Sequence, residues 1–347
     1  MAGQTASPCS QRAFVPDRGP PLILSVIVPV HNGGHELSVC LTALRASTRP
    51  PDELLVVDDA CTDGSAEAAA ALGATVLRSA GRPTGPAAAR NRAALTARGD
   101  VLVFVDADVA LHSDALAQFE ARLTQNPDVD AVFGSYDDTP AAPGMVSRYK
   151  NLLHHYVHQH GGREASTFWS GCGAIRRIAF LRMGGFSEAF QHPSVEDIEL
   201  GMRLRAAGRR VWLCPEVQGT HLKRWTLRGL LYTDVFRRAV PWARLIVKRR
   251  QLPASLNLDW RSRLSALAAW FLVASLVGSL FQTAWLGLAA LALAGLVAAN
   301  WSLYVFFWRH GGVAFAAISG LLHLLYLLYS SATLAACIVA DVLVPRG

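Results

Sequence analysis

The chain has 347 residues, of which 52% are apolar and 17% are charged, and its formal net charge is +7. A soluble globular protein has about 25% charged residues. The shortage lies at one end, because residues 264–347 hold only three charged residues, Arg309, Asp341 and Arg346. This distribution excludes a disordered chain, a disulfide-stabilised miniprotein and a wholly soluble protein. It predicts a soluble domain followed by a membrane domain.

The positive charge is concentrated in one segment. Residues 221–263 have a charge balance of +9, whereas residues 1–220 have a balance of −3. A Lys/Arg cluster beside a membrane span indicates a cytoplasmic segment that faces anionic lipid. No nucleic-acid-binding motif accompanies it, so we expect no nucleic-acid partner. The six cysteines form no CxxC pair and no signal peptide is evident, so we expect a cytoplasmic soluble domain.

The first two thirds of the chain alternate between strand and helix patterns. Residues 1–21 are polar and proline-rich and predict a flexible tail. Beyond the tail we expect strands at 22–30, 53–58, 74–78 and 101–105, and helices at 35–47, 65–72 and 86–98. This order predicts an α/β domain over residues 22–222 with a Rossmann-like, mostly parallel sheet. Ligands of such sheets bind at the carboxyl ends of the strands.

The next elements are less regular. We expect a helix at 113–125, a strand near 130–135, a helix around 196–207 and a short strand near 211–214. Residues 223–263 are basic and apolar and predict an amphipathic segment at the membrane interface.

The charge-poor end predicts an α-helical membrane domain over residues 264–347. Leu264 to Trp308 is an uncharged stretch whose length as a helix, about 67 Å, is twice what one crossing needs. We therefore expect three transmembrane helices, at roughly 264–281, 284–308 and 313–340. Arginines at alternate ends of these spans favour a multi-pass protein with a cytoplasmic N-terminus.

An acidic motif follows the fourth predicted strand. Asp106-Ala107-Asp108 comes directly after the buried pattern VLVFV. Two carboxylates at i and i+2 on a turn can hold a divalent cation together with the diphosphate that the cation neutralises.

A set of short motifs resembles the family 2 glycosyltransferases of the GT-A fold. These motifs occur in the expected order at residues 25–32 (SVIVPVHN), 57–64 (VDDACTDG), 89–91 (ARN), 104–109 (FVDADV), 184–186 (GGF) and 196–201 (EDIELG). The resemblance covers roughly residues 22–222.

The resemblance implies roles at the matching positions. A nucleotide-diphosphate sugar would be bound by Pro29, His31, Asn32, Asp58, Asp59, Arg90 and Asp106. Asp108 would bind a divalent metal, Mn²⁺ or Mg²⁺, with Asp106 beside it and His221 as a third ligand. A neutral imidazole suits Mn²⁺ better than Ca²⁺.

The pair Glu196-Asp197 resembles the ED motif, in which the aspartate is the general base. Asp197 would deprotonate an acceptor hydroxyl during an inverting transfer, and Glu196 would lie beside the acceptor. A phosphate acceptor needs no base, so the pair favours a hydroxyl over a polyprenyl phosphate. Both acceptors remain open. The structural alternative for this pair is two acids stabilised by a helix dipole.

Three further segments have more than one interpretation. Arg224-Trp225 resembles the end of the Q/R-x-x-R-W motif of processive synthases, where it binds diphosphate and acceptor; interfacial anchoring is the alternative. His221 in its first position, and the lack of spans before the domain, weaken the processive interpretation. Gly171 and Cys172 resemble the acceptor loop of the family. His154 and His158 have metal-ligand spacing, but no carboxylate or cysteine accompanies them.

These observations predict a membrane-anchored, metal-dependent inverting glycosyltransferase. Its partners would be a nucleotide-diphosphate sugar, a lipid or lipid-linked acceptor and the bilayer. The alternatives are a polyprenyl-phosphate glycosyltransferase, a processive polysaccharide synthase and a membrane scaffold with a degenerate catalytic domain.

Overall fold

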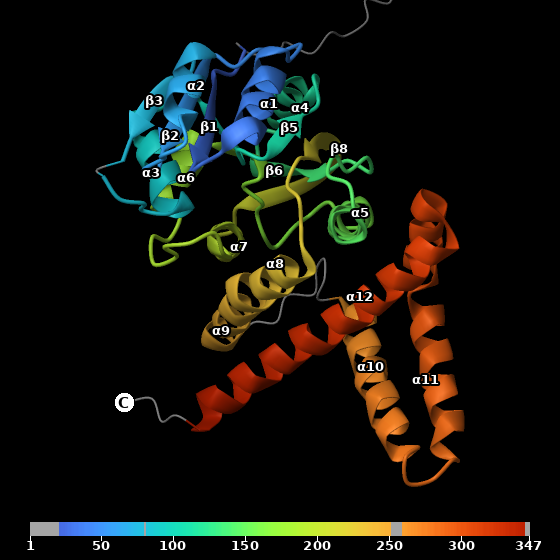
Figure 1. Ribbon diagram of the computed structural model, residues 1–347. Coiled ribbons are helices and arrows are strands. Elements are labelled where there is room, and N and C mark those ends of the chain that lie inside the picture. The colour runs from blue at the N-terminus through green and yellow to red at the C-terminus, as the bar shows by residue number, and fades with distance from the viewer. Residues whose placement is uncertain (1–20, 80, 251–258, 344–347) are drawn as a thin grey trace, which may run out of the picture.

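The computed structural model describes residues 21–79, 81–250 and 259–343. In it an α/β domain is followed by a set of helices at the C-terminal end (Figure 1). The predicted flexible tail lies outside the described residues except for residue 21, and so does the stretch 251–258 of the predicted interfacial segment.

One sheet of eight strands organises the α/β domain. The strand order is β3-β2-β1-β4-β7-β6-β8-β5. The bounds are β1 Leu24–Val30, β2 Glu53–Asp58, β3 Thr75–Arg78, β4 Val101–Val105, β5 Val109–Leu111, β6 Val129–Tyr136, β7 Cys172–Arg176 and β8 Arg210–His221. Strands β1 to β4 are parallel, whereas β7 runs antiparallel to β4 and β6, and β5 runs antiparallel to β8. The predicted α/β class is confirmed, and the sheet is mixed.

Two apolar layers enclose this sheet. On β1, Val26, Val28 and Val30 pack into one layer and Ile27 into the other, because successive strand side chains point to opposite faces. Both faces are covered, which explains the unbroken apolar run of this strand. The covering helices are α1 Gly34–Arg45, α2 Ser65–Ala71, α3 Pro86–Thr96, α4 Ala115–Gln125, α5 Met145–Gln159, α6 Arg177–Arg182 and α7 Glu196–Ala206.

The C-terminal helices are α8 Leu227–Tyr232, η1 Thr233–Ala239, α9 Val240–Arg249, α10 Trp260–Gly278, α11 Trp285–Ala299 and α12 Trp301–Leu343. Helices α10 and α11 form an antiparallel hairpin, and α12 runs back past α8 and α9 beneath the α/β domain (Figure 1). An apolar cluster around Tyr149, Trp225, Phe307 and Phe315 joins α12 to the α/β domain.

The boundaries of the helices differ from those of the predicted spans. The span expected at 284–308 is divided at Asn300, whose side-chain amide donates to the carbonyl of Leu296 and to Ser265 Oγ, both at 2.9 Å. Gly312, at φ 74°, kinks α12. Among the described residues, α12 alone is long and apolar enough to span a membrane, a test of length and composition only. Three crossings and their orientation stay predictions.

Candidate active site

A cavity of about 1370 Å³ connects the strand ends of the α/β domain with the C-terminal helices. Its lining runs from the ends of β1 and β4, across the first turn of α7, to α9, α10 and α12. Twelve predicted site residues line it, namely Pro29, His31, Asn32, Asp59, Arg90, Asp106, Asp108, Glu196, Asp197, His221, Arg224 and Trp225. Three do not, namely Asp58, Gly171 and Cys172.

The short strand β5 brings Asp108 and His221 together. Val109 pairs with His221 across the antiparallel ladder of β5 and β8. The backbone N–H of Leu222 donates to the carbonyl of Asp108 at 2.8 Å. As a result His221 Nε2 lies 3.6 Å from Asp108 Oδ2, although 113 positions separate the two residues.

The buried amide of Asn151, on α5, holds the His221 ring. Asn151 Oδ1 lies 2.6 Å from His221 Nδ1 and accepts its proton, so in the neutral ring the lone pair is on Nε2, which faces Asp108. The ring of Tyr136 stacks on the imidazole with centroids 4.3 Å apart. A carboxylate and an imidazole lone pair that face each other suit a cation between them, and a ligating histidine ordinarily donates its other N–H in this way. This oxygen and nitrogen pair fits Mn²⁺.

Asp106 does not join that pair. Its Oδ1 accepts from Arg90 Nη2 at 2.6 Å, and Arg90 Nη1 donates to Glu196 Oε1 at 2.9 Å. The buried guanidinium therefore ties the end of β4 to the first turn of α7. No group of three His, Cys, Asp or Glu side chains that could hold a metal occurs in the described part of the chain. Within the described residues, Asp108 and His221 form a pair whose geometry suits a cation, and their role as ligands stays a prediction.

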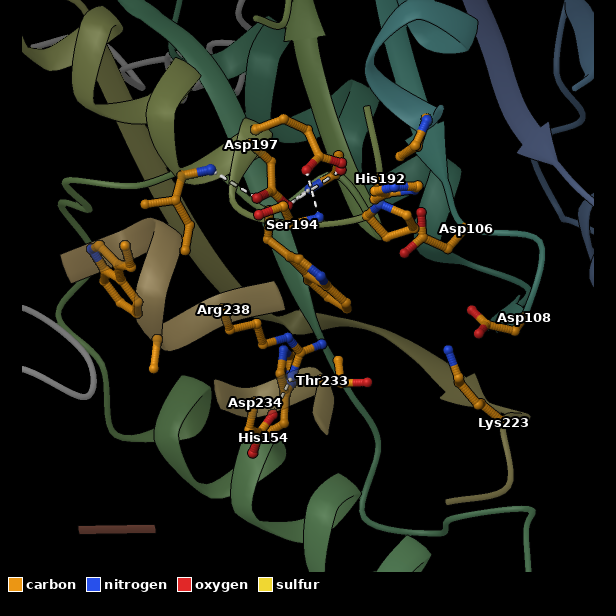
Figure 2. Close-up of a pocket in the computed structure, with 18 of the residues that line it drawn as sticks. Asp106, Asp108, His154, His192, Ser194, Asp197, Lys223, Thr233, Asp234 and Arg238 are labelled. Atoms are coloured by element: carbon orange, nitrogen blue, oxygen red, sulfur yellow. Dashed lines mark hydrogen bonds and ion pairs between the residues drawn. The ribbon is translucent and has the colours of Figure 1, made fainter. Parts of the chain in front are cut away.

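Asp197 is the carboxylate best suited to accept a proton. Its Oδ2 accepts from the N–H and Oγ of Ser170 at 3.0 and 3.2 Å, and its Oδ1 accepts from the N–H of Ile198 at 2.8 Å. Burial raises the pKa of Asp197 to about 6, and the negative charge of Glu196 acts in the same direction. A base with a pKa near the working pH is efficient in proton transfer. Figure 2 shows Asp197 across the pocket from Asp108.

Asp59 organises the loop that contains Thr84 and Gly85 at the strand-end side of the cavity. Its carboxylate accepts from Ser79 Oγ, from the N–H and Oγ1 of Thr84 and from the N–H of Gly85, over 2.7–3.0 Å. Burial alone would raise the pKa of Asp59, but the hydrogen bonds from Thr84 and Gly85 outweigh it and lower that pKa. His31 Nδ1 donates to the carbonyl of Asp59 at 2.8 Å. These contacts shape the loop, and a contact with the base stays a prediction.

Two other residues that were predicted to bind the nucleotide sugar, Asp58 and Asn32, contact neighbouring loop residues. Asp58 accepts from the N–H of Cys61 at 2.7 Å and lies outside the cavity lining. Asn32 adopts φ 55° and accepts from the N–H of Thr62 at 2.8 Å. Both side chains stabilise the turns that follow β1 and β2.

The predicted acceptor loop enters the cavity through Trp169 and Ser170. Gly171 accepts from the N–H of Asp106 through its carbonyl at 3.2 Å. Cys172 pairs with Val105 in the sheet, and burial raises the pKa of its thiol to about 12. A thiol that stays protonated is no nucleophile. Trp225 is buried in the cluster that holds α12, whereas Arg224 is exposed.

The histidine pair of α5 is a packing feature. The rings of His154 and His158 lie 4.0 Å apart and contact Trp169. His158 Nδ1 bonds the carbonyl of Gly134 at 2.9 Å. Burial lowers the pKa of His158 to about 4, so this ring is neutral. No acidic or cysteine ligand accompanies the pair among the described residues.

Sequence reasoning missed several residues that line the cavity. Lys150, Asp234, Arg238 and Tyr329 come from α5, η1 and α12 and meet on the helix side (Figure 2 labels Asp234 and Arg238). Asp234 and Arg238 belong to the basic segment of the sequence, which we interpreted only as a membrane-docking surface. Asn151 was missed because α5, whose pattern is interrupted by polar and histidine residues, was not identified as a helix.

An α/β domain with carboxylates at the ends of parallel strands is the GT-A arrangement expected above. Residues 25–184 match the family described as "Glycosyl transferase family 2". A mannosyltransferase of Pyrobaculum calidifontis, solved with GDP-Man and Mn²⁺, has a similar structure. Its TM-score is 0.54 at 22% identity, and the match covers 94% of this chain and 88% of that one. This likeness confirms the fold.

Curated relatives also bear glycosyltransferase names. An uncharacterized glycosyltransferase of Haemophilus influenzae is 27% identical over 194 residues, which cover 52% of this chain and 62% of the relative. The pre-mycofactocin glycosyltransferase of Mycobacterium tuberculosis is 27% identical over 314 residues, covering 83% of this chain and 64% of the relative. The chain spans less than two thirds of the length of these relatives.

Proposed function

We propose that the protein is a membrane-associated, metal-dependent inverting glycosyltransferase. It would transfer a sugar from a nucleotide-diphosphate sugar to a lipid or lipid-linked acceptor at the cytoplasmic face of the membrane. The observation that carries this proposal is the continuous cavity. It has the strand-end residues His31, Asp106 and Asp108 at one side, Asp197 in its wall and α12 at the other side.

The donor would bind along the strand ends, as in the family 2 enzymes that the domain resembles. The Pyrobaculum neighbour was solved with GDP-Man and Mn²⁺, which supports a nucleotide sugar and a divalent cation here. Asp108 and His221 would hold that cation. When bound, it would supply positive charge that stabilises the diphosphate leaving group.

The acceptor would approach from the helix side. Asp197 takes the proton of the acceptor hydroxyl while the oxygen lone pair forms a bond to the anomeric carbon. The bond from that carbon to the diphosphate oxygen breaks, and its electron pair leaves with the nucleoside diphosphate. Attack opposite the leaving group inverts the anomeric centre. Arg90 holds Glu196 beside Asp197, which keeps the base at the acceptor side.

The proposal is tested with the full chain purified in detergent. We expect Mn²⁺-dependent binding of a nucleotide sugar, and loss of this binding in Asp108→Ala. Mass spectrometry of lipid extracts, from cells with and without the gene, should show a lipid mass shifted by one sugar. If Asp108→Ala leaves both binding and lipid profile unchanged, the scaffold alternative gains and the proposal fails.

A further inference from the structure

An ion pair joins the helix that carries Asp197 to the C-terminal helices. Glu199 lies on α7, two positions after Asp197, and its side chain is 11% exposed. Arg249, the last residue of α9, donates from Nη2 to Glu199 Oε1 at 2.7 Å. Both members of the pair lie outside the cavity lining. They would therefore act on a bound substrate only through α7.

A second arginine holds the same carboxylate within the α/β domain. Arg203, one turn further along α7, donates from Nε to the two carboxylate oxygens of Glu199 at 2.8 and 2.9 Å. The other nitrogens of its guanidinium donate to the carbonyls of Met183 and Gly185. Glu199 therefore keeps a cationic partner when Arg249 is replaced, and no buried charge is left alone.

The position of Arg249 depends on how the C-terminal helices are docked. Helix α9 continues directly from η1, and a three-way contact at Asp234 fixes η1. Lys150 Nζ, on α5, donates to both carboxylate oxygens of Asp234 at 2.7 and 2.8 Å. Tyr329, on α12, donates its hydroxyl proton to Asp234 Oδ2 at 2.7 Å. Helix α9 also packs along α12.

The first turn of α7 is thus held from two directions. Arg90 of α3 donates to Glu196 at 2.9 Å, and Arg249 of α9 donates to Glu199. Asp197 lies in the same turn, so a displacement of Glu199 would displace this carboxylate as well. A shift of about 1 Å in a reacting group can lower a rate by about 100-fold.

We propose that Arg249 is a positioning residue for Asp197, whose ion pair with Glu199 couples the docking of the C-terminal helices to sugar transfer. This inference rests on the proposed function and concerns the regulation of its site. When α9 is docked, Glu199 is held by both arginines and the base is in place. When α9 is displaced, Arg203 still pairs with Glu199, but α7 loses its link to the C-terminal helices.

The test measures sugar transfer by the full chain purified in dodecyl maltoside. Radiolabelled GDP-mannose or UDP-glucose is the donor, Mn²⁺ is present, and a total lipid extract from cells that lack the gene is the acceptor. Arg249→Gln should lower kcat by about tenfold, because a charge-assisted hydrogen bond is lost, while the KM for the donor stays within about twofold. Arg249→Lys should restore about half of the wild-type rate or more, since an ammonium group can keep one hydrogen bond to Glu199.

Arg244→Gln is the matched control. It removes the same charge from an exposed position on the same helix, so its kcat should equal that of wild type. Wild-type kcat in Arg249→Gln would overturn the proposal. An equal loss in Arg244→Gln, or no recovery in Arg249→Lys, would do the same.

Hydrogen–deuterium exchange separates positioning from general stability. In Arg249→Gln the backbone amides of α7 should exchange about tenfold faster, while those of β1 and β4 should exchange as in wild type. Faster exchange throughout the sheet would make Arg249 a residue of global stability and overturn the proposal. So would unchanged exchange in α7.

Failure of this inference is distinguishable from failure of the proposed function. If wild type transfers no sugar, the proposed function fails and the positioning of its base fails with it. If wild type transfers sugar and Arg249→Gln does so equally well, this inference alone fails.

Discussion

The two sides of the cavity have opposite charge. At the strand ends Asp106, Asp108, Glu196 and Asp197 lie with the buried Arg90 and with two exposed cations, Lys223 and Arg224. At the helix side Lys150 and Arg238 outnumber one carboxylate, Asp234. An acidic wall needs a cation to admit a diphosphate, whereas a basic wall admits an anion directly. Under the proposed function, this contrast predicts that the donor diphosphate binds together with a cation at the strand ends.

Removal of the base should have the largest effect. Asp197→Asn preserves the shape of the side chain but cannot accept the proton, so we expect the turnover rate to fall by about 100-fold or more. Donor affinity should stay unchanged, which is measured by titration with nucleotide sugar. Glu67→Gln, on the surface and paired with Arg78, is the control. Full turnover in Asp197→Asn would remove this residue from the mechanism.

Metal binding at the strand-end side of the cavity should also depend on Asn151, a residue that is not expected to contact either substrate. Asn151→Leu removes the acceptor for the His221 N–H, so the affinity for Mn²⁺ should fall by about 10–100-fold. Asn151→Asp keeps an acceptor and should retain most of the affinity. Electron paramagnetic resonance of free Mn²⁺ in titrations of nucleotide-free protein measures both. Equal affinities in wild type and Asn151→Leu would show that this hydrogen bond does not support metal binding.

Titration of Asp197 should determine the acid side of the pH dependence of kcat/KM. The pKa of Asp197 is raised to about 6, so the carboxylate is protonated and inactive below that pH and ionised above it. We expect kcat/KM to fall by about tenfold for each pH unit below 6 and to level off above it. The residual activity of Asp197→Asn should lack this acid limb. An identical limb in the variant would assign it to another group.

The smallest effect is expected at Cys172. This thiol lies in β7 outside the cavity, and burial keeps it protonated, so Cys172→Ala should change turnover by about twofold or less. Thiol-reactive reagents should leave the folded protein active. A large loss of turnover with an unchanged melting temperature would return Cys172 to the acceptor site.

The sequence predicted those parts of the fold that depend on local pattern. The strands β1, β2 and β4 are buried on both faces and appear as short apolar runs that end in polar residues. Helix α5 was not predicted, because its apolar positions are interleaved with Lys150, Asn151 and several histidines. Strand β8 was predicted too short, since Pro215 lies within it. Strand β5 has three residues, too few for a periodicity to be recognised.

The residues of the candidate site also fall into those that the sequence predicted and those that it did not. Asp108, Asp197 and His221 were identified because each stands in a motif, and the structure places all three in one cavity. Their partners could not be identified from motifs. Asn151 and Tyr329 reach His221 and Asp234 across 70 and 95 positions, and only the packing of α5 and α12 brings them there.

The three-way contact at Asp234 limits how this protein can be divided. A fragment that stopped after β8 would lose η1 and α12, and with them Asp234, Arg238 and Tyr329, while the sheet and its strand-end carboxylates would remain. Lys150 would then be a buried cation without its partner. Exchange of the C-terminal helices between related chains would consequently replace the helix side of the cavity wall. Chimaeras should be joined before α5 or should keep α5, η1 and α12 from one parent.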